Sequence, residues 1–132
     1  MSPEVTQGVK YTSKADIFAL GCAMYELLTF ELPFSDDNIA ALFNKILTDH
    51  PEPINGDYDD DCKDIVYSML EKDPDNRPSI YELYQNEFIK NRVNKWCLKD
   101  PIIKTYVESI VSLNKFKTKK APNASAASVQ EN

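Results

Sequence analysis

The chain has 132 residues, of which 42% are apolar and 27% charged, a composition typical of one soluble globular domain and too apolar for a wholly disordered chain. Its net charge is −6, and residues 1–114 carry 11 basic and 20 acidic side chains, because four lysines lie in the tail. A general nucleic-acid-binding surface is therefore not expected, since such a surface needs clustered Lys and Arg.

The first predicted helix runs from about residue 14 to about residue 28. Ser13 and Asp16 have the spacing of a capping box, in which a hydroxyl and a carboxylate satisfy free amides at a helix start. The helix is apolar on almost every face, which predicts a central helix with other elements packed around it. Gly21 lets a neighbouring element approach closely, since glycine otherwise costs a helix about 1 kcal/mol relative to alanine. Pro33 is expected to close the helix.

Three further helices are predicted in the middle of the chain. An amphipathic helix runs from Asn38 to about Thr48 and is followed by a loop that contains His50. Aspartates crowd the start of the next helix, where the helix dipole favours negative charge, and this helix ends before residue 74. Ser79 and Glu82 form a second capping box, which opens a helix leading to residues 88 and 89.

The C-terminal part of the chain differs from what precedes it. Asp100 and Pro101 predict the N-cap and the first residue of another helix, which carries an apolar stripe and reaches about Leu113. We therefore divide the chain into a domain at residues 1–92, a C-terminal extension with one amphipathic helix at residues 93–114, and a disordered tail at residues 115–132. No segment shows the alternation of a strand, so the predicted fold class is mainly α.

The cysteines and the apolar segments favour a cytoplasmic protein. Cys22, Cys62 and Cys97 are odd in number and form no CxxC pair, which argues against a disulfide framework or a zinc site. No stretch reaches the roughly 18 apolar residues of a membrane span. The sequence therefore predicts neither a membrane span nor a bound metal.

Three motifs, in order, resemble the end of a eukaryotic protein serine/threonine kinase domain. Met-Ser-Pro-Glu at residues 1–4 is similar to the Ala-Pro-Glu motif that ends the activation segment. Residues 11–22 resemble the buried central helix of the large lobe, with Phe18 where tryptophan is commoner. Asp-Pro-Asp-Asn-Arg-Pro at residues 73–78 resembles the arginine-containing loop before the last conserved helix. The resemblance covers about residues 1–90 and is greatest to the NIMA-related kinase family.

The resemblance implies a fold and three structural residues. It implies the helical C-terminal lobe of the protein-kinase-like fold, truncated so that the N-lobe, the catalytic loop and most of the activation segment are absent. In this family the glutamate of the first motif pairs with the arginine of the third, here Glu4 with Arg77, and the pair anchors the activation segment. The aspartate at Asp16 accepts hydrogen bonds from the catalytic loop in the family, so in this chain we expect it to cap its own helix.

The motifs for phosphoryl transfer are absent from this sequence. A protein kinase needs a glycine-rich loop, a His-Arg-Asp catalytic loop and an Asp-Phe-Gly aspartate for magnesium. The only glycines are Gly8, Gly21 and Gly56, and the only histidine, His50, is followed by proline. We therefore expect no catalytic, cofactor-binding or metal-binding residue in this chain, and we expect ATP and Mg only in a complete kinase domain.

Two hypotheses for function remain open. In the first, the chain is part of an active kinase whose remaining lobe is encoded upstream, and its partners are protein substrates. In the second, the chain is a binding or decoy module. A central helix without its catalytic loop exposes an apolar face, and such a face is typical of a partner site.

Overall fold

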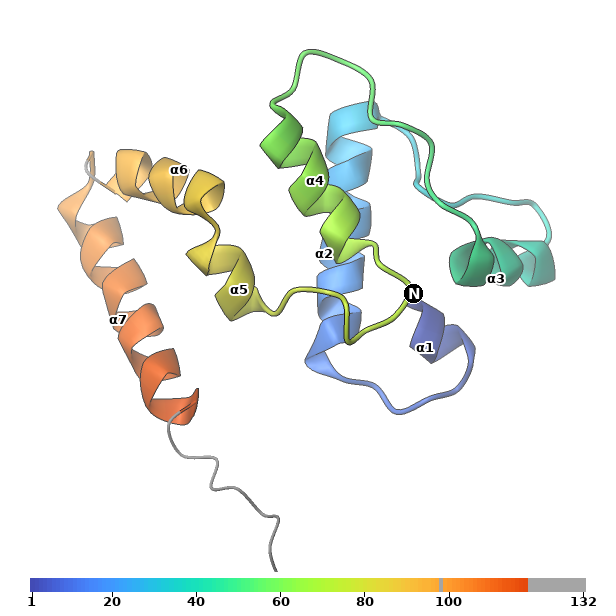
Figure 1. Ribbon diagram of the computed structural model, residues 1–132, viewed down its shortest axis with the longest axis horizontal. Helices are drawn as coiled ribbons and strands as arrows, with labels where there is room; N and C mark the ends of the chain where they lie inside the picture. Colours follow the sequence, from blue (N-terminus) through green and yellow to red (C-terminus); the bar gives the residue numbers. More distant parts are fainter. Residues whose placement is uncertain (98, 119–132) are drawn as a thin grey trace, which may run out of the picture. The chain divides into compact units, whose positions relative to one another are not determined.

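The computed structural model describes residues 1–97 and 99–118, and these residues form helices with no strand among them (Figure 1). The mainly α class predicted from the sequence is confirmed for this part of the chain. The helices are α1 (Pro3–Thr6), α2 (Ser13–Thr29), α3 (Ile39–Thr48), α4 (Asp60–Met69), α5 (Ile80–Gln85), α6 (Glu87–Cys97) and α7 (Pro101–Thr118). The chain divides into two compact units, Met1–Lys90 and a second that begins at Asn91.

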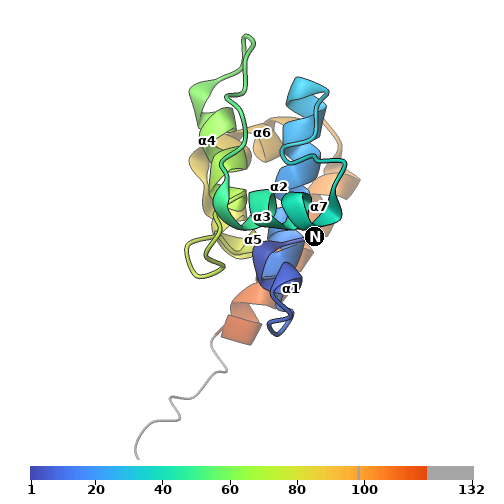
Figure 2. The same ribbon diagram turned by 90° about the vertical axis from the view of Figure 1, so that its right-hand side faces the viewer.

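Two helix pairs organise the first unit. Helix α2 packs along α4, and the two lie side by side in both views (Figures 1 and 2). Helix α1 contacts α3, and Figure 2 shows the two next to each other. The close approach expected at Gly21 is made by α4, because a Cβ atom at Gly21 would lie 2.8 Å from the Cβ of Met69. The absence of a side chain at Gly21 therefore sets the α2–α4 spacing.

One face of α2 forms the core of this unit, together with residues from α3, α4, α5 and the loop before α4. The buried cluster consists of Ile17, Phe18, Tyr25, Ile46, Ile54, Val66, Met69, Leu70 and Leu83. The opposite face of α2 is open, with Leu20 41% and Leu27 68% exposed. The prediction that other elements pack around this helix is therefore wrong for its open side. The apolar residues exposed there agree with the expectation for a central helix without its catalytic loop.

Both ends of α2 differ from the sequence prediction. Thr12, whose backbone is extended, is the N-cap, and its hydroxyl accepts from the amide of Lys14 at 3.3 Å, so the capping box assigned to Ser13 is wrong. The helix ends at Thr29, with Phe30 as its C-cap, before the chain reaches Pro33. Phe30 adopts the left-handed conformation (φ 60°), and its amide donates to the carbonyl of Glu26 at 2.7 Å. Left-handed backbone, rather than Pro33, terminates the helix.

Three predicted helix starts are confirmed. The side chain of Asn38 accepts from the amides of residues 40 and 41, at 2.9 and 3.2 Å. Ser79 and Glu82 form the reciprocal capping box at the start of α5. Asp100 accepts from the amide of Ile102 at 2.9 Å, with proline at the first position of α7. Short polar side chains at these positions satisfy amides that lack partners within the helix.

The segment after α5 is more helical than predicted. Helix α5 ends after Gln85, and the Asn86 side chain then accepts from the amide of Phe88 at 3.0 Å, which starts a separate helix, α6. Helix α6 crosses the predicted division between residues 92 and 93. Helix α7 extends to Thr118, so residues 115–118 of the predicted disordered tail are helical, consistent with the good helix propensity of lysine. The rest of that tail, residues 119–132, lies outside the described residues.

No described helix combines the length and the apolarity that crossing a membrane would require.

Candidate functional site

The centre of the candidate site is Arg77, in the loop between α4 and α5. The preceding turn is held by Asp73, whose carbonyl accepts from the amide of Asn76 at 3.1 Å and whose carboxylate accepts from the amide of Asp75 at 2.9 Å. This turn chemistry directs the arginine inward, where the residue is 1% exposed. Arg77 is the largest of the fully buried side chains in the described chain.

All five N–H donors of the Arg77 guanidinium have acceptors. Two of them go to the carboxylate of Glu4, from Nη1 to Oε1 at 2.8 Å and from Nη2 to Oε2 at 2.6 Å. The remaining three go to backbone carbonyls of Lys14 (2.8 Å), Glu71 (2.6 Å) and Lys72 (3.0 Å). A guanidinium has five donors in a fixed plane, so this site satisfies all of them without water.

Glu4 reaches this site from α1, and it is 5% exposed. Its two parallel hydrogen bonds with Arg77 are the bidentate arrangement in which a carboxylate and a guanidinium bind most strongly. Arg77 lowers the pKa of Glu4 below its ordinary value of 4.5, although burial of the carboxylate acts in the opposite direction. The structure thus brings together the two residues that the resemblance paired, and it holds Glu4 as a carboxylate.

An aromatic layer lies beside the ion pair. Phe18 of α2 is 0% exposed, and its ring stacks with that of Phe34 at 6.1 Å between centroids and 10° between planes. The guanidinium carbon of Arg77 lies 5.0 Å from the centroid of Phe18. A cation within about 6 Å of a ring face is attracted by the ring quadrupole. The ring of Phe18 therefore helps to stabilise the buried charge of Arg77.

Two lysines complete the site, and sequence analysis identified neither of them. Lys72 donates through Nζ to the carbonyl of Ile46 in α3 at 2.7 Å, and its Nζ lies 3.9 Å from the centroid of Phe34. Burial lowers the pKa of Lys72 to about 8. The ammonium of Lys14 donates to the carbonyl of Arg77. The sequence does not predict these roles, because both lysines donate to backbone carbonyls, and no side-chain motif identifies such an acceptor.

Asp16 is not part of this cluster. Its carboxylate accepts a hydrogen bond from the hydroxyl of Tyr11, which raises the pKa of the tyrosine. The expectation that Asp16 closes a capping box with Ser13 is wrong, because Thr12 caps the helix one residue earlier. Of the three structural residues named from the sequence, the structure brings two together and places the third at the entry to α2.

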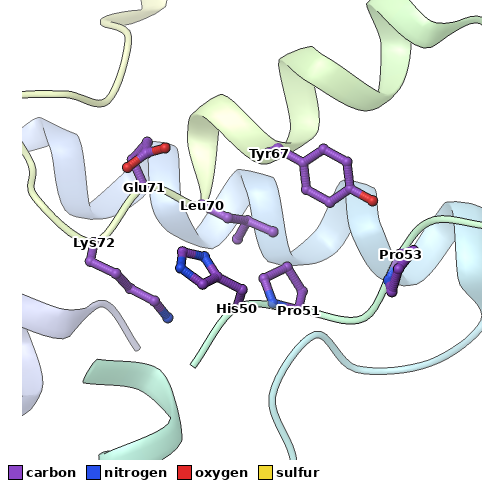
Figure 3. Close-up of a pocket in the computed structure, with 7 residues that line it drawn as sticks. All are labelled: His50, Pro51, Pro53, Tyr67, Leu70, Glu71 and Lys72. Carbon is purple, nitrogen blue, oxygen red and sulfur yellow. The ribbon is translucent and has the colours of Figure 1, made fainter. Parts of the chain in front are cut away.

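A cavity of about 260 Å³ adjoins the buried charge (Figure 3). It is lined by residues of the α3–α4 loop, of α4 and of the segment that follows α4: His50, Pro51, Pro53, Tyr67, Leu70, Glu71 and Lys72. The hydroxyl of Tyr67 accepts from the amide of Ile54 at 2.7 Å. Glu71 and Lys72 also give Arg77 two of its carbonyl acceptors, so the cavity wall and the ion pair share backbone.

The described residues contain no group of three or more His, Cys, Asp or Glu side chains placed to hold a metal ion. The chemistry present at this site is a buried, fully hydrogen-bonded ion pair between α1 and the α4–α5 loop. An arrangement of that kind fixes two distant segments of chain, 73 residues apart in sequence, in one geometry.

Comparison with known proteins gives one family and several relatives. The family model for the protein kinase domain matches residues 1–89. The chain is 42% identical over 90 residues to the probable serine/threonine-protein kinase nek3 of Dictyostelium discoideum. It is 30% identical over 130 residues to the serine/threonine-protein kinase Nek1 of Mus musculus, and 30% identical over 111 residues to Nek5 of Homo sapiens.

The matched regions cover most of this chain and a small part of each relative. The match to nek3 spans 67% of this chain and 8% of the relative. The match to Nek1 spans 98% and 11%, and the match to Nek5 spans 84% and 16%. The family match includes Glu4 and Arg77, and it ends one residue before the first compact unit ends, at Lys90.

Proposed function

Because the chain belongs to the protein kinase domain family and its relatives are Nek-type serine/threonine kinases, we propose that residues 1–89 are the C-terminal part of a kinase helical lobe. In a complete domain this part supports ATP-dependent phosphoryl transfer to serine or threonine of protein substrates. Its own contribution is structural, since it fixes the segment around Glu4 against the lobe.

The observation that carries this proposal is the saturated ion pair. Arg77 is 1% exposed, and every guanidinium donor has a protein acceptor. A buried charge of this kind is costly unless its geometry is complete. Five hydrogen bonds and a buried charge pair are concentrated at one contact between α1 and the α4–α5 loop. This concentration supports an anchoring role for that contact.

In this proposal the 132 residues transfer no phosphate by themselves. ATP and Mg do not fit the residues present, since the sequence holds no glycine-rich loop, no His-Arg-Asp and no Asp-Phe-Gly. These groups supply nearly all of the positioning and charge stabilisation in kinase catalysis. The site residues Glu4, Arg77 and Asp16 are structural, and none of them is assigned a catalytic role.

A chimera tests the proposal. In it, residues 1–89 replace the matching segment of the mouse Nek1 kinase domain, and phosphorylation of a serine-containing protein substrate is measured. We expect the chimera to be active and the isolated 132-residue chain to be inactive. The same chimera with Arg77→Ala should lose activity together with thermal stability, while Lys10→Ala, at an exposed lysine, should change neither.

Two results would count against the proposal. A chimera that folds but is inactive with the native residues would show that this chain cannot serve as the lobe segment. Phosphoryl transfer by the isolated chain would show that it contains catalytic groups that the sequence motifs do not reveal.

A second candidate function is a helical binding or decoy module, and the open face of α2 favours it. Leu20, Leu27 and Phe30 are 41%, 68% and 88% exposed on or directly after this helix. Contiguous exposed apolar surface is typical of a site for a protein partner. In this version the partner covers the α2 face, and the chain acts without phosphoryl transfer.

Gel filtration with light scattering on the 132-residue chain discriminates the two candidates. A binding module should form a stable, stoichiometric complex or oligomer that Leu27→Glu disrupts, with Lys10→Glu as the control at an exposed residue of the same unit. A folded monomer whose behaviour Leu27→Glu leaves unchanged would remove the observation that favours this candidate.

A cytoplasmic location is part of the same proposal. Cys22 and Cys62 are free thiols, and burial raises the pKa of Cys22, which keeps it protonated. Free cysteines in a folded domain are typical of a reducing compartment. Fractionation of cells that express the tagged chain would test the location.

A further inference from the structure

Residues 90–99, which span most of α6 and the turn after it, are rich in basic side chains. Residues 90–99 contain four basic side chains and no acidic one, in a chain whose net charge is −6. Glu87 precedes this stretch and Asp100 follows it, and further lysines lie at residues 104, 115 and 117. The basic stretch therefore contrasts with the net negative charge of the chain as a whole.

Three of the four basic side chains line a hollow of about 410 Å³ in the second compact unit. Its described lining consists of Asn91, Arg92, Lys95 and Lys99. Asn91, Arg92 and Lys95 lie on α6 at spacings of three and four residues, which places them on one face of the helix. Lys99 follows the end of α6 and brings a third cation to the same hollow.

The chemistry of this lining matches an oxyanion. Arginine offers a planar fork of N–H donors that fits phosphate oxygens, and lysine offers a point charge with three donors. The amide of Asn91 adds two neutral N–H donors. The positive charges that line the hollow attract an anion.

We propose that this hollow binds the phosphate group of a compact phosphorylated ligand. A half-open hollow of this size accommodates a single phosphate or a short polyphosphate. A nucleic acid would instead need cations spread along an extended backbone, whereas the described lining of this hollow is confined to residues 91–99. The family match ends at residue 89, so the site lies outside the region on which the proposed function rests.

Isothermal titration of the full 132-residue chain with two probes tests the site and separates the sources of the ligand. The probes are inorganic tripolyphosphate and a phosphoserine peptide, with the unphosphorylated peptide as the reference. We expect saturable binding of at least one phosphorylated probe, weakened by added salt, and none of the reference. Each charge removed at an exposed site should weaken binding about two- to fivefold.

The decisive comparison uses two variants with the same net charge. Lys95→Gln/Lys99→Gln removes two cations from the hollow, and Lys10→Gln/Lys63→Gln removes two from the first unit. The first should weaken phosphate binding at least about fourfold, and the second should leave it within about twofold. Circular dichroism should show the same helix content for both.

The proposal is overturned if both variants bind the phosphorylated probes equally well, because the effect would then follow net charge alone. It is also overturned if neither phosphorylated probe binds. Tighter binding of a single-stranded RNA than of either probe, lost in the Lys95→Gln/Lys99→Gln variant, would replace it with a nucleic-acid site.

Discussion

The buried charge of Arg77 combines large opposing contributions to stability. Removing an ion from water is expensive, and its attraction to Glu4 together with three carbonyl hydrogen bonds offsets that cost. The net contribution of the complete site is therefore modest. Removing either Glu4 or Arg77 alone is strongly destabilising, because the charge of the remaining residue then stays buried without a partner.

The first prediction concerns Arg77→Ala. This substitution leaves the Glu4 carboxylate and three carbonyls without their donors, so we expect it to lower the free energy of unfolding by about 3 to 5 kcal/mol. Urea unfolding followed by circular dichroism measures the change.

A paired substitution is the matched control for Arg77→Ala. Glu4→Leu/Arg77→Met removes both charges and keeps apolar volume. It should cost less than Arg77→Ala, because no unpaired charge stays buried, although the same three carbonyls lose their donors. If Arg77→Ala costs less than about 1 kcal/mol, the range of a surface pair, the ion pair does not hold these segments together.

The second prediction concerns acid. The pKa of Glu4 is lowered in the folded protein, so between that pKa and the ordinary value of 4.5 the unfolded state binds more protons. The stabilisation from Glu4 is thus complete above pH 4.5 and is lost as the pH falls through the lowered pKa. The difference in unfolding free energy between the native chain and Glu4→Gln should shrink from neutral pH to about pH 3. A difference that is constant with pH would contradict this assignment.

The residue-level site was partly predictable from the sequence. Glu4 and Arg77 belong to motifs, so their pairing followed from the resemblance. The contributions of Lys14, Glu71 and Lys72 did not, because they accept through backbone carbonyls, and a carbonyl is present at every position whatever the side chain. The aromatic side of the site was also missed, since Phe18 was noted only as a substitute for tryptophan.

At the scale of elements, the packing of α2 on α4 gives the third prediction. Gly21→Ala would gain about 1 kcal/mol of helix propensity, but its Cβ would lie 2.8 Å from the Cβ of Met69. That neighbour is close to the backbone and cannot move aside cheaply. We expect a net loss of about 1 to 2 kcal/mol in unfolding free energy, as for other overpacked cores.

Ala23→Gly, on the exposed side of the same helix, is the control for Gly21→Ala, because it measures the alanine–glycine difference in helix propensity alone. It changes propensity without changing packing and should cost about 1 kcal/mol. If Gly21→Ala is instead stabilising by that amount, the close approach of α4 is not a constraint.

The end of α2 gives the fourth prediction. Phe30 is left-handed and 88% exposed, so its side chain contributes little packing while its Cβ is strained. Phe30→Gly should raise the free energy of unfolding by about 0.5 to 1 kcal/mol. Phe30→Ala keeps the Cβ and should give no gain. Equal stabilisation by both variants would assign the effect to loss of the exposed ring.

Whether a helix start is predicted correctly depends on how clearly one residue at that start is the best N-cap. Ser79 is followed by a capping glutamate and Asp100 by a proline at the first helical position, and these signals predict their N-caps correctly. The helix predicted from Asn38 begins one residue later, with Asn38 as its N-cap. Thr12 and Ser13 are adjacent hydroxyl residues, and sequence alone chose the wrong one because backbone geometry decides between them. The break at Asn86 was missed for a related reason, since an asparagine within an apolar periodic stretch does not by itself indicate a new N-cap.

At the scale of the whole molecule, the core found among the described residues belongs to one unit. Every residue of the buried apolar cluster lies within Met1–Lys90. The fifth prediction is that a chain ending at Lys90 unfolds cooperatively, with a free energy within about 0.5 kcal/mol of that of the full chain. A chain ending at Lys72, which lacks Arg77, should not unfold cooperatively. Loss of cooperativity on removing residues 91–132 would show that the core depends on the second unit.

The hydrogen bonds of Arg77 also determine which positions can vary during evolution. Three of its five acceptors are main-chain oxygens, which no side-chain replacement removes. A saturation mutagenesis library should therefore tolerate most substitutions at the exposed Glu71, although its carbonyl holds the arginine at 2.6 Å. At position 77 the same library should be depleted of every alternative, lysine included, since no other side chain supplies five donors in one plane. Position 71 would thus vary among related sequences while position 77 would stay arginine, although both residues take part in the same hydrogen-bonded site.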